Sequence, residues 1–170
     1  FDEVVVATGV RPRDPAIPGQ DLPHVATYAD ILTGRLAAGP RVAIVGAGGI
    51  GFDVAEFLVT GRSPTLHPAE WRAEWGVGDP AEVRGGVAAP RPAPPLRQVT
   101  LVQRKAGRPG QGLGRTTGWI HRASLRMKGV RMVGGAAYDR IAPEGLWLRL
   151  GAGAPELVEA DTVVLCAGQE

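Results

Sequence analysis

The sequence contains a single cysteine, Cys166, among its 170 residues. One thiol cannot form an internal disulfide, a CxxC redox pair, a four-ligand zinc site or an iron–sulfur cluster by itself. A chain without structural disulfides is typical of the reducing cytosol, so we expect a cytoplasmic location. We interpret Cys166 as a small buried residue and not as a nucleophile.

Long apolar runs and a strong charge of either sign are also missing. No uncharged stretch is longer than Val42–Phe52, which is too short for a transmembrane helix. The 19 Lys+Arg residues against 17 Asp+Glu leave a net charge of +2, which gives no reason to expect a nucleic-acid partner. The three histidines show no spacing that suggests a metal ligand or a general base, so we expect no metal site and no catalytic residue.

What the sequence does contain is an alternation of strands and helices. Continuous apolar runs predict strands buried on both faces of a parallel sheet, at Glu3–Ala7, Arg41–Val45, Gln98–Gln103, Val130–Val133 and Asp161–Cys166. Helices are expected at Tyr28–Gly34, at Gly49–Thr60 with an apolar face of Ile50, Val54, Phe57 and Leu58, and at Thr117–Lys128. Residues 138–150 predict an antiparallel meander. The fold class is therefore α/β, a Rossmann-like parallel sheet with a βαβαβ core and an antiparallel β-meander.

Residues 61–97 interrupt this core with a proline-rich segment, which holds nearly half of the 15 prolines. The sequence predicts an insertion between the first core helix and the second core strand, with a short helix over Pro68–Gly76. Trp71 and Trp75 in this helix have two interpretations. They belong either to a satellite core or to a surface that docks on another domain or subunit.

A glycine-rich turn, Gly46-Ala47-Gly48-Gly49-Ile50-Gly51, joins the strand at Arg41–Val45 to the helix that follows. In a dinucleotide fold the first glycine permits the tight turn, the second lets the backbone approach a pyrophosphate, and the third lets the helix pack on the strand. The helix N-terminus offers free N–H groups and a partial positive charge to the phosphates. The alternative is a tight strand–helix turn without a ligand, but the context of strand and amphipathic helix favours a dinucleotide site.

Basic residues follow the next strand and indicate which dinucleotide binds. Without the insertion, Gln103 falls about 20 residues after Gly46, where the ribose-reading residue is expected. An acid there would accept hydrogen bonds from the ribose of NAD, but this sequence has a neutral Gln103 followed by Arg104 and Lys105, with Arg108 and Arg115 beyond. Two charge-assisted bonds to a 2′-phosphate would give about 10²- to 10⁴-fold preference for NADPH over NADH. The alternative is a solvated basic strand end.

Two further positions are candidate nucleotide contacts. Asp53 lies on the first part of the core helix, where it either faces the nicotinamide half of the cofactor or only complements the helix dipole. Ala167 and Gly168 follow the last strand, and a glycine there permits a close approach of the backbone to a ligand.

With these features in place, the chain resembles the pyridine-nucleotide domain of bacterial NADPH-dependent 2,4-dienoyl-CoA reductases. The resemblance covers nearly the whole chain. It rests on the runs Phe1–Arg13, Gly46–Ala55, Glu74–Gly76, Gln103–Arg122 and Val164–Glu170. The runs GWIHR (118–122) and CAGQE (166–170) are more specific than any glycine motif.

The resemblance implies a segment of a multidomain flavoprotein. Residues 1–38 would be a fragment of an FAD domain with a crossing segment, residues 39–166 the NADPH domain, and residues 167–170 the start of the return to the FAD domain. Thr8 and Gly9 would then contact FAD, while Arg104 and Lys105 would meet the 2′-phosphate of NADPH. Electrons would pass from NADPH to FAD, through a [4Fe–4S] cluster to FMN, and on to a conjugated double bond during β-oxidation of unsaturated fatty acids.

The implied partners are the FAD domain and the FMN and iron–sulfur domains of the same polypeptide. We expect this chain to bind NADPH and not to reduce an acyl-CoA alone. One rival hypothesis is the corresponding domain of a related amine dehydrogenase, which need not use NADPH. Another is a non-catalytic structural or interaction module.

Overall fold

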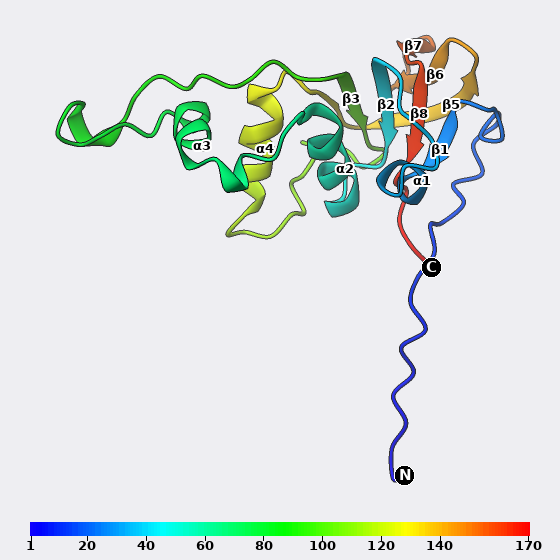
Figure 1. Ribbon diagram of the computed structural model, residues 1–170. Coiled ribbons are helices and arrows are strands. Elements are labelled where there is room, and N and C mark those ends of the chain that lie inside the picture. The colour runs from blue at the N-terminus through cyan, green and yellow to red at the C-terminus, as the bar shows by residue number, and fades with distance from the viewer.

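The computed structural model describes all residues, 1–170, and its centre is a five-stranded parallel sheet (Figure 1). The strand order is β1-β8-β2-β3-β4. The strands are β1 (Val25–Thr27), β2 (Arg41–Val45), β3 (Gln98–Val102), β4 (Arg131–Val133) and β8 (Thr162–Leu165). The connections from β2 to β3 and from β3 to β4 contain α2 (Gly49–Val59) and α4 (Gly118–Met127), which gives the expected βαβαβ core.

A second, antiparallel sheet covers the face of the central sheet opposite to the helices. It contains β5 (Ala136–Ala142), β6 (Gly145–Leu150) and β7 (Glu156–Glu159). The expected fold class, a Rossmann-like parallel sheet with an antiparallel meander, is confirmed. The sequence did not predict β7 or β1, because both are short and lack a continuous apolar run.

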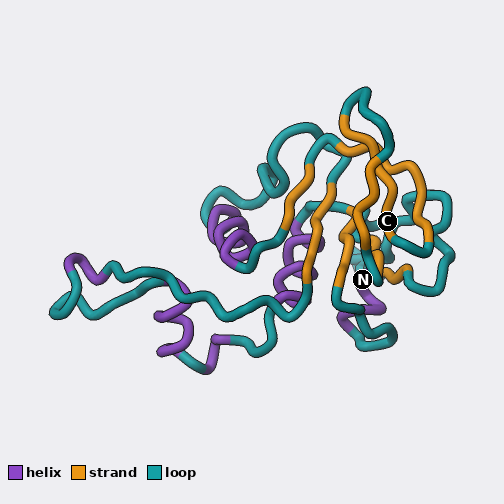
Figure 2. The backbone as a smooth tube through the Cα atoms, turned by 90° about the horizontal axis from the view of Figure 1, so that it is seen from above, coloured by secondary structure: helices purple, strands orange, loops and turns teal.

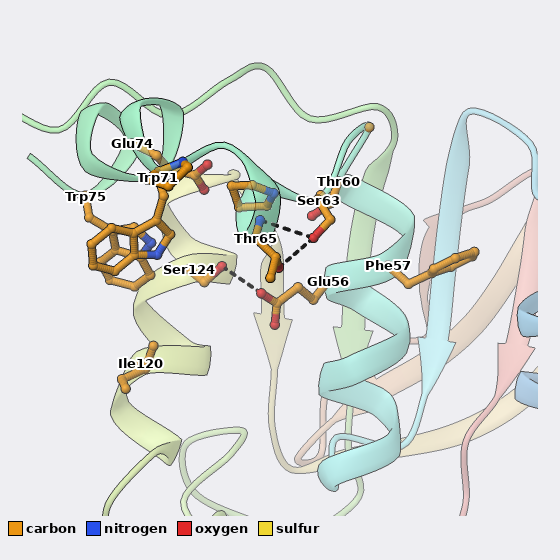
Figure 3. Close-up of a pocket in the computed structure, with 13 residues that line it drawn as sticks. Glu56, Phe57, Thr60, Ser63, Thr65, Trp71, Glu74, Trp75, Ile120 and Ser124 are labelled. Atoms are coloured by element: carbon orange, nitrogen blue, oxygen red, sulfur yellow. Dashed lines mark hydrogen bonds between the residues drawn. The ribbon is translucent and has the colours of Figure 1, made fainter.

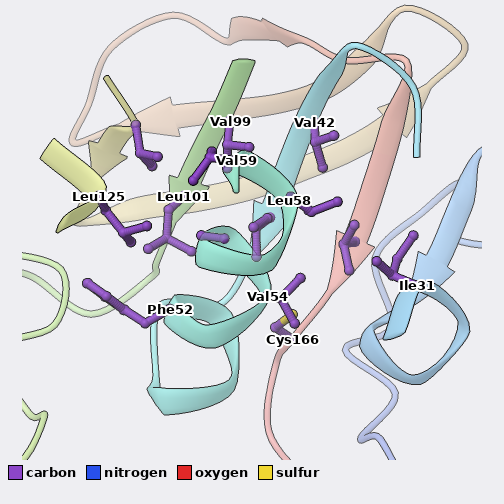
Figure 4. Packing of buried hydrophobic residues seen from close by; sticks show 14 of the residues in the cluster. Ile31, Val42, Phe52, Val54, Leu58, Val59, Val99, Leu101, Leu125 and Cys166 are labelled. Carbon is purple, nitrogen blue, oxygen red and sulfur yellow. The ribbon is translucent and has the colours of Figure 1, made fainter. Parts of the chain in front are cut away.

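The core lies in two layers on either side of the central sheet. Along β2, Val42 and Ile44 pack in the helix-side cluster, while Ala43 and Val45 pack against the second sheet. Figure 4 shows the helix-side cluster, in which Phe52 of α2 lies near Leu101 of β3. Successive strand residues point to opposite faces, so a strand between two layers is apolar throughout.

The predicted burial of Phe57 on the apolar face of α2 is wrong. The side chain of Phe57 is 52% exposed, whereas Phe52 is 1% exposed and Val54 and Leu58 are fully buried. The buried face runs through residues 51, 52, 54, 55, 58 and 59, and the helical period places Phe57 on its flank.

The predicted strand at Glu3–Ala7 is also wrong. Val4, Val5 and Val6 are 78–88% exposed, and no strand pairs with them (Figure 1). A strand needs the hydrogen bonds of a neighbouring strand, so the apolar run by itself cannot form one. The first pairing of this N-terminal segment is the isolated antiparallel bridge between Pro12 and Gln169.

The insertion contains η1 (Pro64–Leu66), α3 (Pro68–Trp75) and η2 (Arg84–Gly86), and its loop projects away from the sheets (Figure 2). The expected helix α3 is confirmed and ends where Gly76 takes the left-handed conformation, with φ of 69°. A buried ion pair of 3.1 Å joins Glu74 Oε1 of α3 to Nζ of Lys128, the residue that caps α4. This pair holds α3 against the core.

The remaining helix, α1 (Tyr28–Leu32), begins at a Thr27 capping box and lies on the same side as α2. None of the helices is long and apolar enough to cross a membrane.

Candidate functional site

A pocket of about 740 Å³ opens at the carboxyl ends of β2, β3 and β8. The chain leaves β2 toward β3 on one side, while β8 pairs with β2 on the other side, so the strand order reverses beside β2. In open α/β sheets ligands bind in the crevice at this switch point. The fold therefore puts the glycine-rich turn where a nucleotide is expected.

The three glycines of the motif have different surroundings. Gly46 has φ of 111°, and an added Cβ would meet the backbone of Cys166 at the end of β8. An added Cβ at Gly51 would meet the carbonyl of Gly46 and lie 3.3 Å from Leu101 Cδ1, so only glycine lets α2 pack this closely on the sheet. An added Cβ at Gly48 has no atom within 4 Å, because this residue borders the open pocket.

The N-terminus of α2 opens into the same pocket. Gly48 is its N-cap and supplies no side-chain hydrogen bond, and Gly49 and Ile50 of the first turn line the pocket. The first N–H groups of a helix have no partner within the helix. An anion in the pocket would therefore meet free backbone donors and the positive end of the helix dipole.

The opposite side of the pocket is basic. Arg104, Lys105 and Arg108 line it, and none of them has an ion-pair partner in the structure. No carboxylate is among the lining residues. The pocket as a whole is thus suited to a polyanion with phosphates at both ends.

Gln103 is in the pocket wall but its side chain is engaged with its own loop. Its Nε2 donates to the carbonyl of Lys105 at 2.9 Å and to that of Gly107 at 3.4 Å. The residue therefore shapes the loop that carries the cations, and a role in reading the ribose directly would require these bonds to change.

Two residues that the sequence did not assign to the site close its floor. The hydroxyl of Tyr138, on β5, donates to the carbonyl of Val102 at 3.1 Å. Burial raises the pKa of Tyr138 to about 12 and that of the Cys166 thiol to about 12, so both groups stay neutral around pH 7. Cys166 is 5% exposed, which confirms its interpretation as a buried residue. Tyr138 comes from the second sheet, and no motif spacing could have predicted it.

Most of the expected nucleotide contacts come together here. The pocket lining includes Gly46, Ala47, Gly48, Gly49, Ile50, Gln103, Arg104, Lys105, Ala167 and Gly168. It also includes residues that were not expected: Ala106, Gly110, Gln111, Gly112, Leu113 and Gln169. The latter come mainly from the glycine-rich loop after β3, which folds over the pocket.

Five expected contacts lie outside this lining. Gly51 is packed beneath the turn, while Asp53 on α2 and Arg115 in the loop before α4 are exposed. Thr8 and Gly9, the expected FAD contacts, lie on the exposed N-terminal segment. Their roles stay predictions.

The chain is similar to known proteins over nearly its whole length. The family model of the pyridine nucleotide-disulphide oxidoreductases matches residues 1–170. A metal reductase of Desulforamulus reducens is 30% identical over 176 residues, which are 99% of this chain and 24% of the relative. The 6-hydroxypseudooxynicotine amine oxidase HisD of Pseudomonas geniculata N1 is 29% identical with a TM-score of 0.68, over 99% of this chain and 22% of that structure.

A 2-naphthoyl-CoA reductase complex has the same fold, with a TM-score of 0.70 and 20% identity, over 96% of this chain and 20% of that structure. The chain thus spans at most about a quarter of the length of these three relatives.

Proposed function

The chain belongs to the pyridine nucleotide-disulphide oxidoreductase family, and we propose that it is the NADPH-binding unit of a flavoprotein reductase. The observation that supports this most strongly is the combination within one pocket of an uncapped helix N-terminus and three unpaired cations. The helix N-terminus suits a pyrophosphate and the cations suit a phosphate monoester, and NADPH carries both groups.

The preference for NADPH over NADH rests on side chains and not on the fold. Structures of the same fold, each about 20% identical to this chain, include one described as bound to NADPH and one described as bound to NADH. In this chain no carboxylate lines the pocket to repel a 2′-phosphate, and Arg104 and Lys105 directly follow the position of the ribose-reading residue. These two cations are the proposed 2′-phosphate contacts.

Bound NADPH would supply a hydride to a flavin. The residues of this chain hold the nucleotide: the turn Gly46–Gly51 receives the pyrophosphate, and the cations hold the adenosine end. Tyr138 and Cys166 present neutral groups at the floor of the pocket. The contact of Thr8 and Gly9 with FAD is part of the same proposal.

The test uses the smallest pair of ligands that differ only in the 2′-phosphate, adenosine 2′,5′-bisphosphate and 5′-AMP. Calorimetric titration of the chain should show binding of the bisphosphate at least about 10²-fold tighter than that of AMP, because two charge-assisted bonds are added. Equal affinities would contradict the assignment of a 2′-phosphate site.

For the whole protein we propose NADPH-dependent reduction of 2,4-dienoyl-CoA in the cytoplasm, with FAD, FMN and a [4Fe–4S] cluster held by domains outside these residues. This substrate class is proposed on the resemblance to the 2,4-dienoyl-CoA reductases, in which the runs GWIHR (118–122) and CAGQE (166–170) are the most specific features. The full-length protein should consume the conjugated diene when NADPH is added, as followed by ultraviolet absorbance. Activity of the 170-residue chain alone, or none in the cofactor-loaded full-length protein, would contradict the proposal.

An amine-oxidising flavoprotein is the second candidate, because the amine oxidase HisD is 29% identical over 99% of this chain. The two candidates differ in what reduces the flavin. If an amine bleaches the flavin of the full-length protein and NADPH does not, the amine reading holds and the NADPH proposal fails.

A further inference from the structure

A second pocket, of about 780 Å³, lies between the insertion and the two core helices α2 and α4 (Figure 3). It is separate from the nucleotide pocket, with which it shares no lining residue. The C-terminal half of α2 forms one wall, while the first turn of α2 borders the nucleotide site. The walls are formed by Glu56, Phe57, Thr60, Ser124, Ile120 and the insertion residues 61–75.

Two tryptophans form the aromatic side of this pocket. Trp71 and Trp75 are one helical turn apart on α3, so their rings lie on the same side of the helix, 6.4 Å apart between centroids and tilted by 35°. Trp71 is 45% exposed although it lines the pocket. In Figure 3 both rings lie across the pocket from Glu56.

The carboxylate of Glu56 faces this aromatic side and is weakly bound within the protein. Its Oε1 is 3.5 Å from Ser124 Oγ, and its Oε2 is 3.4 Å from His121 Nδ1. Both distances are at the long limit of a hydrogen bond, so the carboxylate retains most of its capacity to accept. Glu56 is 43% exposed, which leaves it accessible to a ligand.

The pocket lining contains two charged residues, Glu56 and Glu74. Glu74 forms the buried ion pair with Lys128, and Arg62 forms an ion pair with Glu70 at the edge of the insertion. Glu56 is therefore the lining carboxylate that has no lysine or arginine partner, and its one ion-pair contact is His121 Nδ1 at 3.4 Å. This is the opposite of the nucleotide pocket, which has cations and no carboxylate.

We propose that this pocket binds a small organic cation, an ammonium group substituted with alkyl chains. Tryptophan faces attract such cations through their π electrons, and alkylated ammonium ions lose less hydration than a bare ammonium when they are buried. The Glu56 carboxylate provides the countercharge, and the apolar faces of Ile120 and the tryptophans accept the alkyl substituents. Anionic ligands are disfavoured by the same charge. The proposal is independent of the nucleotide assignment.

The probes are choline and its uncharged isostere 3,3-dimethylbutan-1-ol, titrated into the chain by calorimetry. Choline should bind at least about 10-fold tighter than the alcohol, since the two differ mainly in charge. Glu56→Gln should weaken choline binding at least about 5-fold and leave binding of the alcohol nearly unaffected, because it removes only the countercharge. Trp71→Ala should also weaken choline binding at least about 5-fold, and it should weaken binding of the alcohol less, because the alcohol loses only an apolar contact. Trp119→Ala is the matched control, because Trp119 is 57% exposed on α4 but does not line the pocket.

Thermal unfolding followed by circular dichroism checks that each variant is folded. If Trp71→Ala unfolds the insertion, Trp71→Phe takes its place and should retain most of the choline affinity. Equal binding of the two probes, no choline binding at tens of millimolar, or full affinity in a folded Glu56→Gln variant would each overturn the proposal.

Discussion

At Gly46 the backbone has φ of 111° and an added Cβ would meet the backbone of Cys166, whereas an added Cβ at Gly48 meets no atom within 4 Å. The two glycines, two residues apart, are therefore required for different reasons. The first is needed by the fold, because L side chains rarely adopt that conformation. The second is free of such constraints and borders the space that a pyrophosphate would occupy.

We therefore expect Gly46→Ala and Gly48→Ala to separate stability from binding. Gly46→Ala should lower the free energy of unfolding by about 3 kcal/mol, through strain and backbone overlap. Gly48→Ala should cost less than about 1 kcal/mol, yet weaken NADPH binding at least about 10-fold because the methyl group occupies the approach path. Urea unfolding and calorimetry measure the two effects. Unchanged NADPH affinity in a folded Gly48→Ala variant would count against a pyrophosphate at this turn.

Cys166 predicts a specific alkaline sensitivity. Burial raises the pKa of its thiol from 9.0 to about 12, so the folded state disfavours the thiolate. The stabilising contribution is complete below pH 9, the unfolded value, and is lost as the pH rises toward 12.

Tyr138, whose unfolded pKa is 10.0, lowers the free energy of unfolding by less than about 0.5 kcal/mol between pH 9 and 10. The fall caused by the Cys166 thiol over the same interval should be about 1 kcal/mol. Cys166→Ala should remove that fall, as measured by urea unfolding at the two pH values. The same fall in the variant would show that another group titrates.

At the scale of elements, the helices and the long strands could be predicted because their patterns are local. The run at Arg41–Val45, in which four apolar residues follow Arg41, and the glycine turn after it predict β2 and the start of α2 to within a residue. β1 and β7 are held by pairing with strands distant in sequence, so their few residues carry no signal of their own. The run Glu3–Ala7 shows the converse, since apolar residues without a partner strand remain exposed.

The nucleotide site, like the fold, could be predicted only where its residues form local sequence motifs. The turn at Gly46–Gly51 and the basic residues after β3 are sequence motifs, and the structure places most of them around one pocket. Tyr138 reaches this pocket from the second sheet by tertiary packing, which no spacing reveals. The pocket lined by Glu56 could not be predicted for the same reason, because residues of the insertion form part of its wall.

The ion pair between Glu74 and Lys128 holds α3 of the insertion against the end of α4. The side chains are 14% and 5% exposed, so removal of one partner leaves a charge poorly solvated. Lys128→Ala should destabilise the chain by about 3 kcal/mol and speed proteolysis within residues 61–97. The double variant Lys128→Met, Glu74→Met should restore most of this stability, because it leaves no uncompensated charge. If the Lys128→Ala variant resists proteolysis as well as the native chain does, other contacts hold α3.

At the scale of the whole molecule, the two pockets lie at opposite ends of α2. Helices, the central sheet and the second sheet bury their apolar residues in two clusters. α2 extends between the two pockets, with basic surroundings at its first turn and the Glu56 carboxylate near its end. The chain therefore presents two binding environments of opposite charge.

The N-terminal segment contributes little to this arrangement. Residues 1–10 are all exposed. Deletion of residues 2–9 should change the melting temperature by less than about 2 °C, a shift that corresponds to well under 1 kcal/mol for a chain of this size. A loss of several degrees would show that the segment packs on the sheets in solution.

In the proposed NADPH site, Arg104 and Lys105 hold the 2′-phosphate beside the glycine turn. The most direct measurement is calorimetric titration of NADPH and NADH into the chain and into the double variant Arg104→Ala, Lys105→Ala. We predict that NADPH binds the native chain about 10²-fold or more tightly than NADH, and that the variant binds both with the weaker affinity. Equal affinities in the native chain, or a preference for NADPH that survives in the variant, would contradict the assignment of Arg104 and Lys105 to the 2′-phosphate.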